Sequence, residues 1–286
     1  MKKIITVLFA FVGIMLTSCD TSVVDKEDVD VSNVEKEEVQ GDSEINALDQ
    51  IQEVSDMLSL DNGIKIKWFE HGNGEKLAYA DLVAIDYKVL LDDGTIVDGN
   101  ELLKKESIPY ILGFGMQTKG WDIALKELTV GDFAEIYIPS NLARGEKGIP
   151  GLIPANANNT LKVRVLDKIK PTREIDGCKV WVFEENKSNT ELFGEGNQIE
   201  FDCIASTPSK RDYINTFRQS KPFTLKLEDY GTIPGLKKAL INAKRADRMI
   251  VYIPSSEAYG TKGYLDLVKP NEDLMYNILV SNVIKE

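Results

Sequence analysis

The chain repeats itself with a spacing of 115 residues, and this repeat limits its fold more than any other feature. The tetrapeptide Tyr-Ile-Pro-Ser at 137–140 returns at 252–255. Three glycines, at 120, 145 and 148, each have a partner glycine 115 residues later. Turn residues repeated at a fixed spacing indicate a duplicated structural unit. We therefore expect two modules of one fold in tandem, over residues 60–170 and 171–286.

Alternating segments separated by turn residues predict an antiparallel sheet in the first repeat. The longer expected strands are residues 82–91 and 160–169, and Asp92-Asp93-Gly94 has the chemistry of a hairpin turn. One segment, residues 120–128, reads as a helix. Many hairpin-connected strands with one helix predict an α+β fold, in which each antiparallel sheet wraps around one short α-helix.

The N-terminal residues read as a targeting segment. Two lysines precede an apolar run over residues 4–16, which is too short to span a bilayer comfortably. The run ends in Leu-Thr-Ser-Cys, which resembles the bacterial lipobox that directs lipid attachment to the cysteine. The alternative is a plain secretory signal with an incidental cysteine. Small residues before Cys19 and a polar tract after it favour a signal peptide over 1–18, a lipid anchor on Cys19, and a cell-envelope location facing the periplasm or cell surface.

The negative charge of the chain is concentrated in one tract. Residues 20–50 hold eleven acidic residues and two lysines, and so account for nine of the twelve net negative charges. This composition predicts a disordered tether over 19–42. The rest of the chain has no basic stripe, which argues against nucleic acid as a partner. Helical spacing of apolar residues then predicts an amphipathic helix over 43–59, packed on the first module or paired with a second copy.

Few residues could support acid–base or metal chemistry. His71 is the only histidine and lies in a Gly/Asn turn, so we expect no Ser-His-Asp triad, no metal site and no cofactor. Cys178 and Cys203 fall in expected strands of the second module. We expect them to be small core residues rather than a disulfide, although an exported chain permits one.

An apolar pocket is the chemistry that residues 112–154 offer. Trp121 stands at the start of the one expected helix, and a loop rich in Gly, Ile and Pro follows at 148–154. A tryptophan at a helix start is, taken alone, more often a core residue than a pocket residue. The motifs around it reverse that expectation.

These residues together resemble the FKBP-type peptidyl-prolyl cis-trans isomerases. The resemblance rests on Tyr87 and Asp98 around a hairpin, on Gly120-Trp121, and on Gly-Ile-Pro-Gly-Leu-Ile-Pro at 148–154. It covers residues 60–168 well and residues 177–285 less well. Each motif alone is common, but the combination at this separation is specific. The resemblance implies a half-open antiparallel sheet curled around one helix in each module.

The resemblance also implies that the chain accelerates rotation about X-Pro bonds. The partial double bond of the imide imposes a barrier of roughly 18–20 kcal/mol. The twisted imide loses resonance and part of its dipole, so an apolar pocket that removes it from water favours the transition state. The reaction requires no proton transfer, covalent intermediate or cofactor. The expected partners are proline-containing unfolded or exported polypeptides.

Site residues follow from the same resemblance. Trp121 forms the floor of the pocket and Tyr87 a wall. Asp98 orients polar contacts, although it could be only a turn residue. The backbone N–H of Ile153 is expected to donate to a bound carbonyl. The other expected substrate-binding residues of this module are Val97, Tyr110, Gln117, Thr118, Arg144, Leu152 and Val163.

Several of these residues depart from the family pattern. Arg144 replaces a tyrosine whose hydroxyl would bond the substrate, and Gln117-Thr118 replace two aliphatic residues. Valines at 97 and 163 replace aromatic residues. These changes make the expected cleft shallower and more polar, which lowers the expected activity. The enzymatic interpretation requires an open cleft over the indole, not one capped by Arg144.

The second module departs further and is expected to bind or support rather than catalyse. Leu236 replaces the floor tryptophan, Cys203 the wall tyrosine and Ile214 the aspartate. Its degenerate pocket is expected to be lined by Phe223, Ile233, Leu236, Tyr259 and Tyr276.

Two other functions fit the same residues. One is a non-catalytic chaperone or adaptor whose degenerate pockets bind extended apolar peptides. The other is a surface lipoprotein that has kept only the fold. Proline isomerisation by residues 60–170 that depends on Trp121 distinguishes the enzyme from both.

Overall fold

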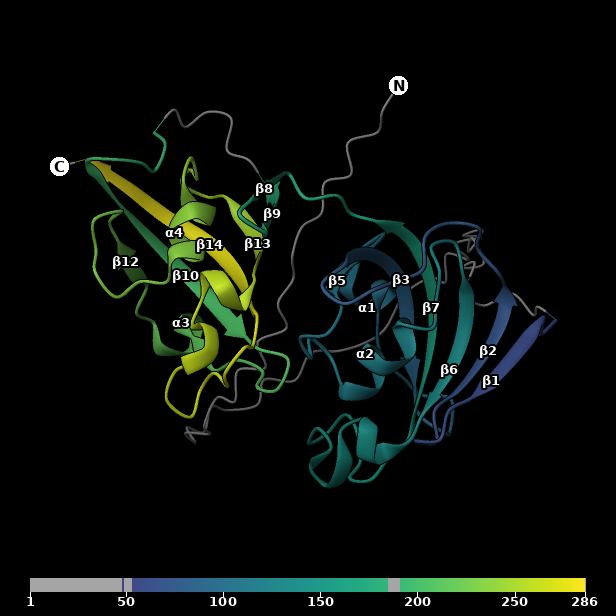
Figure 1. The fold of residues 1–286 in the computed structure, drawn as a ribbon. Helices are drawn as coiled ribbons and strands as arrows, with labels where there is room; N and C mark the ends of the chain where they lie inside the picture. The colour runs from purple at the N-terminus through teal and green to yellow at the C-terminus, as the bar shows by residue number, and fades with distance from the viewer. Residues whose placement is uncertain (1–47, 49–52, 185–190, 286) are drawn as a thin grey trace, which may run out of the picture.

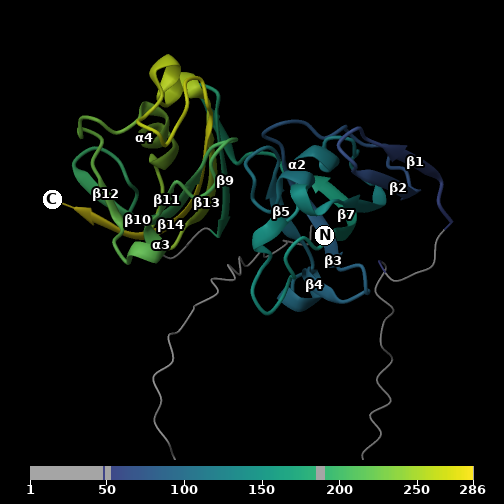
Figure 2. The same cartoon turned by 90° about the horizontal axis from the view of Figure 1, so that it is seen from below.

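The structure, a computed structural model, describes residue 48 and the ranges 53–184 and 191–285 (Figure 1). The expected signal peptide, Cys19 and the acidic tether lie outside these residues. None of the helices in the described ranges combines the length and apolar character needed to cross a bilayer. The described residues form two modules that lie side by side, as Figures 1 and 2 both show.

The first module is a seven-stranded antiparallel sheet in the order β1-β2-β6-β7-β3-β4, with β5 paired to β3. Buried and partly exposed residues alternate along β6 and β7, so one face of the sheet carries the core. Helix α2 packs on that face through its buried residues. The elements are β1 (Asp56–Ser59), β2 (Lys65–Glu70), β3 (Leu82–Leu90), β4 (Ile96–Gly99), α1 (Asn100–Leu103), β5 (Ile108–Ile111), α2 (Lys119–Leu125), β6 (Phe133–Ile138), η2 (Ser140–Leu142), η3 (Gly145–Lys147) and β7 (Asn159–Lys168).

The second module repeats this architecture. Its sheet has the order β11-β10-β14-β13-β9-β8, with β12 paired to β10, and α4 packs against it. The predicted α+β fold, two modules each with an antiparallel sheet around one short helix, is confirmed. The elements are β8 (Arg173–Ile175), β9 (Cys178–Glu184), β10 (Asn197–Ser206), β11 (Ile214–Asn215), α3 (Thr216–Gln219), β12 (Phe223–Leu225), α4 (Pro234–Leu240), β13 (Arg248–Ile253), η4 (Ser255–Glu257), η5 (Gly260–Lys262) and β14 (Leu274–Lys285).

At the start of α2 and of α4, steric crowding explains why both repeats have a glycine. A Cβ atom at Gly120 would lie 2.3 Å from Cγ2 of Ile138, and one at Gly235 would lie 2.4 Å from Cγ2 of Ile253. Both separations are far below van der Waals contact. Only glycine therefore lets each helix begin this close to its sheet.

The prediction of a helix over residues 43–59 is wrong for the last four of these residues. Residues 56–59 form strand β1, which pairs with the edge of the sheet at β2 so that Leu58 stands opposite Ile66. The strand gives hydrogen-bond partners to the otherwise open edge of β2. This stabilisation outweighs the tendency of the apolar residues at helical spacing to form a helix. The sheet of the first module therefore begins before residue 60. Residues 43–47 and 49–52 lie outside the described ranges.

The two cysteines of the second module are core residues, as predicted. Cys178 in β9 and Cys203 in β10 are both buried free thiols. Burial raises the pKa of Cys178 to about 11 and that of Cys203 to about 12.

The modules also share a small core, here called the junction cluster. It joins the β5 side of the first module to β9, β13 and β14 of the second (Figure 2). The Tyr79 hydroxyl adds a hydrogen bond of 3.0 Å to Oδ2 of Asp273 across the junction. Packed side chains as well as the chain between β7 and β8 thus connect the modules. The buried members are Ala80, Leu82, Ile111 and Phe114 from the first module, with Trp181, Ile250 and Met275 from the second.

Candidate functional site

Three aromatic rings meet at the start of α2. The Trp121 ring lies edge-on to Tyr87, with 5.0 Å between centroids and an interplanar angle of 82°. The ring of Tyr110, on strand β5, lies 5.6 Å from the Trp121 ring between centroids, with an interplanar angle of 31°. Trp121 and Tyr87 are each only 3% exposed. These rings, here called the aromatic site, bring together three residues that the sequence assigned to one pocket.

The hydroxyl of Tyr87 is held by Asp98. It donates to Oδ1 of Asp98 over 3.0 Å, and the two residues come from the paired strands β3 and β4. Burial, and after it the charge of Asp98, raises the pKa of Tyr87 well above its ordinary value. The hydroxyl therefore stays protonated and keeps its donor role at neutral pH.

Asp122 holds the second tyrosine and was not expected from the sequence. Its Oδ1 accepts from the Tyr110 hydroxyl at 2.7 Å and from the Gly113 N–H at 2.9 Å. Its Oδ2 accepts from the Gly115 N–H at 2.8 Å. Asp122 therefore fixes the segment that leads into α2. An acidic residue in the first turn of a helix was the available signal.

A chain of side-chain hydrogen bonds, here called the polar bridge, runs beside the aromatic site. Arg144 donates from Nη2 to Oε1 of Gln117 at 2.8 Å, and Gln117 donates from Nε2 to Oδ2 of Asp98 at 3.3 Å. The bridge meets the aromatic site at Asp98, which also accepts from the Tyr87 hydroxyl. Trp121 is only 3% exposed, so its neighbours cover almost all of it and the expected open cleft is not formed over the ring. A prolyl ring reaches the indole only after some of these neighbouring side chains move.

The loop at 148–154 contributes one buried and one exposed aliphatic side chain, Ile153 and Leu152. The N–H of Ile153 donates to the Ile149 carbonyl at 2.8 Å. In this loop conformation the donor is already used, so that binding a substrate carbonyl would require the Ile153–Ile149 bond to break, and the role expected of this N–H stays a prediction. Val97 and Val163 are buried within the same apolar cluster as the rings.

Thr118, the N-cap residue of α2, carries a buried hydroxyl next to the aromatic site in sequence and fold. Its Oγ1 has no hydrogen-bond partner among the described residues. A buried polar atom without a partner costs about 1–3 kcal/mol. A substrate amide that bonds to this hydroxyl would remove that cost.

The corresponding position of the second module has no indole. Leu236 in α4 and Ile233 just before it are buried in its core, as is Cys203 on β10. Phe223 on β12 is exposed and packs against Phe201 with 5.9 Å between centroids. The floor and wall of the aromatic site are therefore absent here.

Four tyrosines gather around this position instead. The hydroxyls of Tyr213 and Tyr276 lie 3.3 Å apart, and Tyr259 stacks on Tyr264 with 4.8 Å between centroids. Burial raises the pKa of Tyr213, Tyr259 and Tyr276. Tyr213 and Tyr264 were not expected, because nothing in their local sequence distinguishes them from surface tyrosines.

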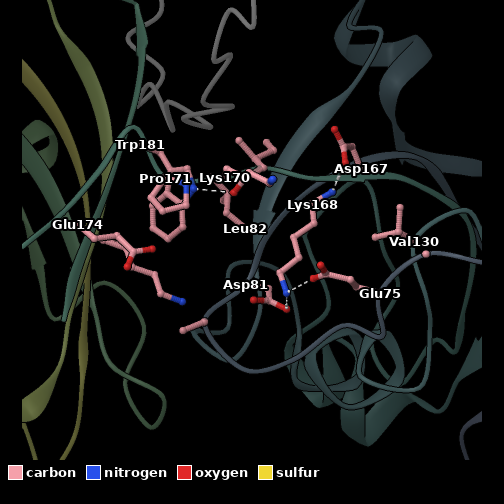
Figure 3. A pocket seen from close by; sticks show the side chains of 14 residues that line it. Glu75, Asp81, Leu82, Val130, Asp167, Lys168, Lys170, Pro171, Glu174 and Trp181 are labelled. Atoms are coloured by element: carbon pink, nitrogen blue, oxygen red, sulfur yellow. Dashed lines mark hydrogen bonds and ion pairs between the residues drawn. The ribbon is translucent and has the colours of Figure 1, made fainter.

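A separate cavity of about 390 Å³ lies at the junction between the modules (Figure 3). Nζ of Lys168 lies 3.0 Å from Oε2 of Glu75 and 3.0 Å from Oδ2 of Asp81. The indole N–H of Trp181 donates to the Ile169 carbonyl at 2.8 Å. None of the residues lining this cavity belongs to the aromatic site. In the described ranges, no group of three or more His, Cys, Asp or Glu is placed to hold a metal ion.

Comparison with known proteins matches both modules to one family. The family model for the FKBP-type peptidyl-prolyl cis-trans isomerase matches residues 74–166 and again residues 190–281. The FK506-binding protein 1 of Candida glabrata is 34% identical over 109 residues, which are 38% of this chain and 95% of that protein. The FK506-binding protein 4 of Aspergillus fumigatus is 37% identical over 105 residues, which are 37% of this chain and only 21% of that protein.

Among solved structures, the three FKBP domains of wheat FKBP73 align with 79% of this chain and 97% of that one. The sequence identity is 22% and the TM-score is 0.39, which is too low to compare how the modules are arranged.

Proposed function

Because the chain belongs to the FKBP-type peptidyl-prolyl cis-trans isomerase family, we propose that its first module accelerates cis–trans isomerisation of X-Pro bonds in polypeptides. The observation that carries the proposal is the aromatic site, in which Trp121 lies against Tyr87 and Tyr110. A prolyl ring seated on the indole is removed from water. The twisted imide, with its smaller dipole, loses less by this transfer than the planar imide does, so the barrier falls.

The residues around the rings suit the amides that flank a proline. The hydrogen-bonded pair Tyr87–Asp98 supplies a fixed polar group beside the rings. The Thr118 hydroxyl supplies a second polar group, which has no hydrogen-bond partner among the described residues. We infer that Gln117 and Arg144 turn away when a proline enters, because the bridge they form ends at Asp98 beside the rings.

We assign the activity to the first module. The second module has Leu236 in place of the indole and Cys203 in place of the wall tyrosine. Neither residue supplies an aromatic seat or a hydroxyl donor. Its contribution to the reaction is then through the first module rather than through a second site.

The test compares the full chain with its Trp121→Ala and Leu236→Ala variants, using exchange NMR on a Leu-Pro peptide. Loss of the indole lowers kcat/KM by at least about tenfold, a change of about 1.4 kcal/mol in transition-state stabilisation. Leu236→Ala, the matched change in the second module, also removes a buried side chain, so it is compared at a temperature where circular dichroism shows it folded, and its kcat/KM then stays within about twofold of wild type. Wild-type protein that suppresses aggregation without accelerating exchange would instead support the chaperone function.

We further propose that the protein is exported and held at a membrane by lipid on Cys19. The support is the sequence: two lysines, an apolar run, the Leu-Thr-Ser-Cys motif and the acidic tract that follows. This location gives the isomerase access to exported polypeptides in the cell envelope. The wild-type chain is expected in the detergent phase after phase separation, and the Cys19→Ser variant in the aqueous phase. Equal partitioning of both would contradict lipidation.

A further inference from the structure

One side chain of the second module reaches the polar bridge of the first. Arg211 lies in the segment between β10 and β11, and its Nη1 donates to the backbone carbonyl of Gln117 at 3.3 Å. Gln117 is the central member of the bridge and directly precedes Thr118, the N-cap of α2. The surroundings of the aromatic site are therefore completed by a residue 94 positions away, in the other module.

Arg211 places a second positive charge close to Arg144. Both arginines bond Gln117, and burial first, then the charge of Arg211, lowers the pKa of Arg144, whereas Asp98 and Tyr87 raise it. The nearby carboxylates are already engaged. Asp98 accepts from Gln117, and Asp212 lies 3.6 Å from both Arg211 and Arg218. The Arg211 side chain is nevertheless 45% exposed, which leaves N–H donors open to a ligand.

A packed interface fixes the segment that Arg211 contacts. Phe114 is buried in the junction cluster, where its ring lies 6.1 Å from that of Tyr252. Met116 packs against both the junction cluster and the core of the first module. The second module thus holds the segment around Gln117 at two points, Phe114 and the Gln117 carbonyl. The acceptor of the Arg211 hydrogen bond is therefore fixed by packing.

We propose that Arg144 and Arg211 together make the isomerase prefer substrates with an acidic residue beside the proline. This inference rests on the proposed function of the first module. A carboxylate between two guanidinium groups relieves their repulsion and accepts charge-assisted hydrogen bonds, for which the planar donor fork of arginine is well suited. A lysine at the same substrate position is repelled.

The experiment uses the full chain and three peptides that differ only in having Glu, Leu or Lys before proline. Wild-type protein is expected to have a kcat/KM about fivefold higher for the Glu peptide than for the Lys peptide, the range of an exposed ion pair. Arg211→Glu lowers this ratio by about tenfold, because attraction becomes repulsion. The Leu peptide changes by less than about twofold. The matched control is Arg245→Glu, the same charge change at an exposed arginine between α4 and β13, which leaves the ratio unaltered.

The outcomes separate this inference from the proposed activity. An unchanged Glu-to-Lys ratio in Arg211→Glu overturns it while the Leu peptide still reports isomerisation. An equal loss for all three peptides also overturns it, because Arg211 then only holds the segment in place. If wild-type protein turns over no peptide, the isomerase proposal fails. Fluorescence anisotropy of the same three peptides, labelled with fluorescein, then measures their affinities and decides the inference. A charge preference in binding that Arg211→Glu removes supports it, and the lack of a preference overturns it.

Discussion

Gln117 makes contacts in three directions at once: its amide bonds Asp98 and Arg144, and its carbonyl accepts from Arg211. Where the family resemblance places an aliphatic side chain, this chain has the central member of a polar bridge. On the proposed mechanism, a proline that enters breaks the side-chain bonds, and the polar groups left beside it exclude water less well than aliphatic groups would. The side chain at this position then contributes to the cost of opening the site.

Replacing Gln117 with valine is expected to raise kcat/KM for a Leu-Pro peptide by about threefold. Valine cannot bond Asp98 or Arg144, so opening costs less by about the value of one net hydrogen bond, roughly 0.5–1.5 kcal/mol. Exchange NMR on the full chain measures the change. Gln219→Val, at the exposed end of α3, is the control and leaves the rate unaltered. A fall in the Gln117→Val rate would show that the bridge aids the reaction.

Cys203 makes the second module sensitive to alkaline pH. Burial raises its pKa from the ordinary 9.0 to about 12, so the folded state keeps a proton that the unfolded state has lost. Its stabilising contribution is complete below pH 9 and falls as pH rises from 9 towards 12, by up to about 1.4 kcal/mol per pH unit.

Urea unfolding at pH 8 and at pH 10.5 tests this sensitivity. The wild type is expected to lose more free energy of unfolding over this range than the Cys203→Ala variant does. Cys178→Ala should remove a loss of nearly the same size, because the pKa of Cys178, raised to about 11, also lies above pH 10.5. Parallel losses in the wild type and in Cys203→Ala would contradict the assignment.

At the scale of elements, each module depends on how closely its helix approaches its sheet. Gly120→Ala and Gly235→Ala are each expected to destabilise the folded protein by about 1–3 kcal/mol, the usual cost of overpacking. The added Cβ would meet Ile138 or Ile253 at the separations given above. Thermal unfolding measures the change. Gly194→Ala is the control, since a Cβ there has no atom within 4 Å, and a comparable loss in that variant would argue against the steric cause.

The longer elements could be predicted from the sequence because their signals are local. Alternation identifies β3 and β7, and the glycine before Trp121 identifies the start of α2. Strand β1 could not be predicted, because a four-residue edge strand exists only through its pairing with β2. Strand β4 and helix α1 are also four residues each, too short to show a period.

Residue types identified the rings of the aromatic site, but not the hydrogen bonds around them. The polar bridge depends on side-chain geometry, and the use of the Ile153 N–H depends on how its loop folds back on itself. Arg211 had no sequence signal at all, because its partner lies in the other module.

At the scale of the whole molecule, the junction cluster links the stability of the two modules. The chain between β7 and β8 is short and is itself bonded, since Ile169 donates to the Leu82 carbonyl at 2.7 Å and Thr172 to that of Val180 at 2.8 Å. We expect the described part of the chain to unfold in one cooperative transition.

Phe114→Ala is expected to divide that transition into two. Removing a buried phenylalanine costs about 3–5 kcal/mol, and here the loss falls on the contact between modules. Differential scanning calorimetry of the full chain distinguishes one transition from two. Phe223→Ala, at an exposed phenylalanine of β12, should keep a single transition. Two transitions in the wild type, or one in Phe114→Ala, would show that the modules unfold independently of this contact.

The contact between Arg211 and Gln117 has a consequence for how such a chain evolves. A duplicated copy without a catalytic site of its own, as proposed for the second module, is ordinarily free to drift. If Arg211 serves the first module as proposed, selection on that module extends into the loop around Arg211. Among descendants of the same duplication, substitutions at Arg211 should be accompanied by substitutions at Gln117 or Arg144, while Leu236 varies without regard to them.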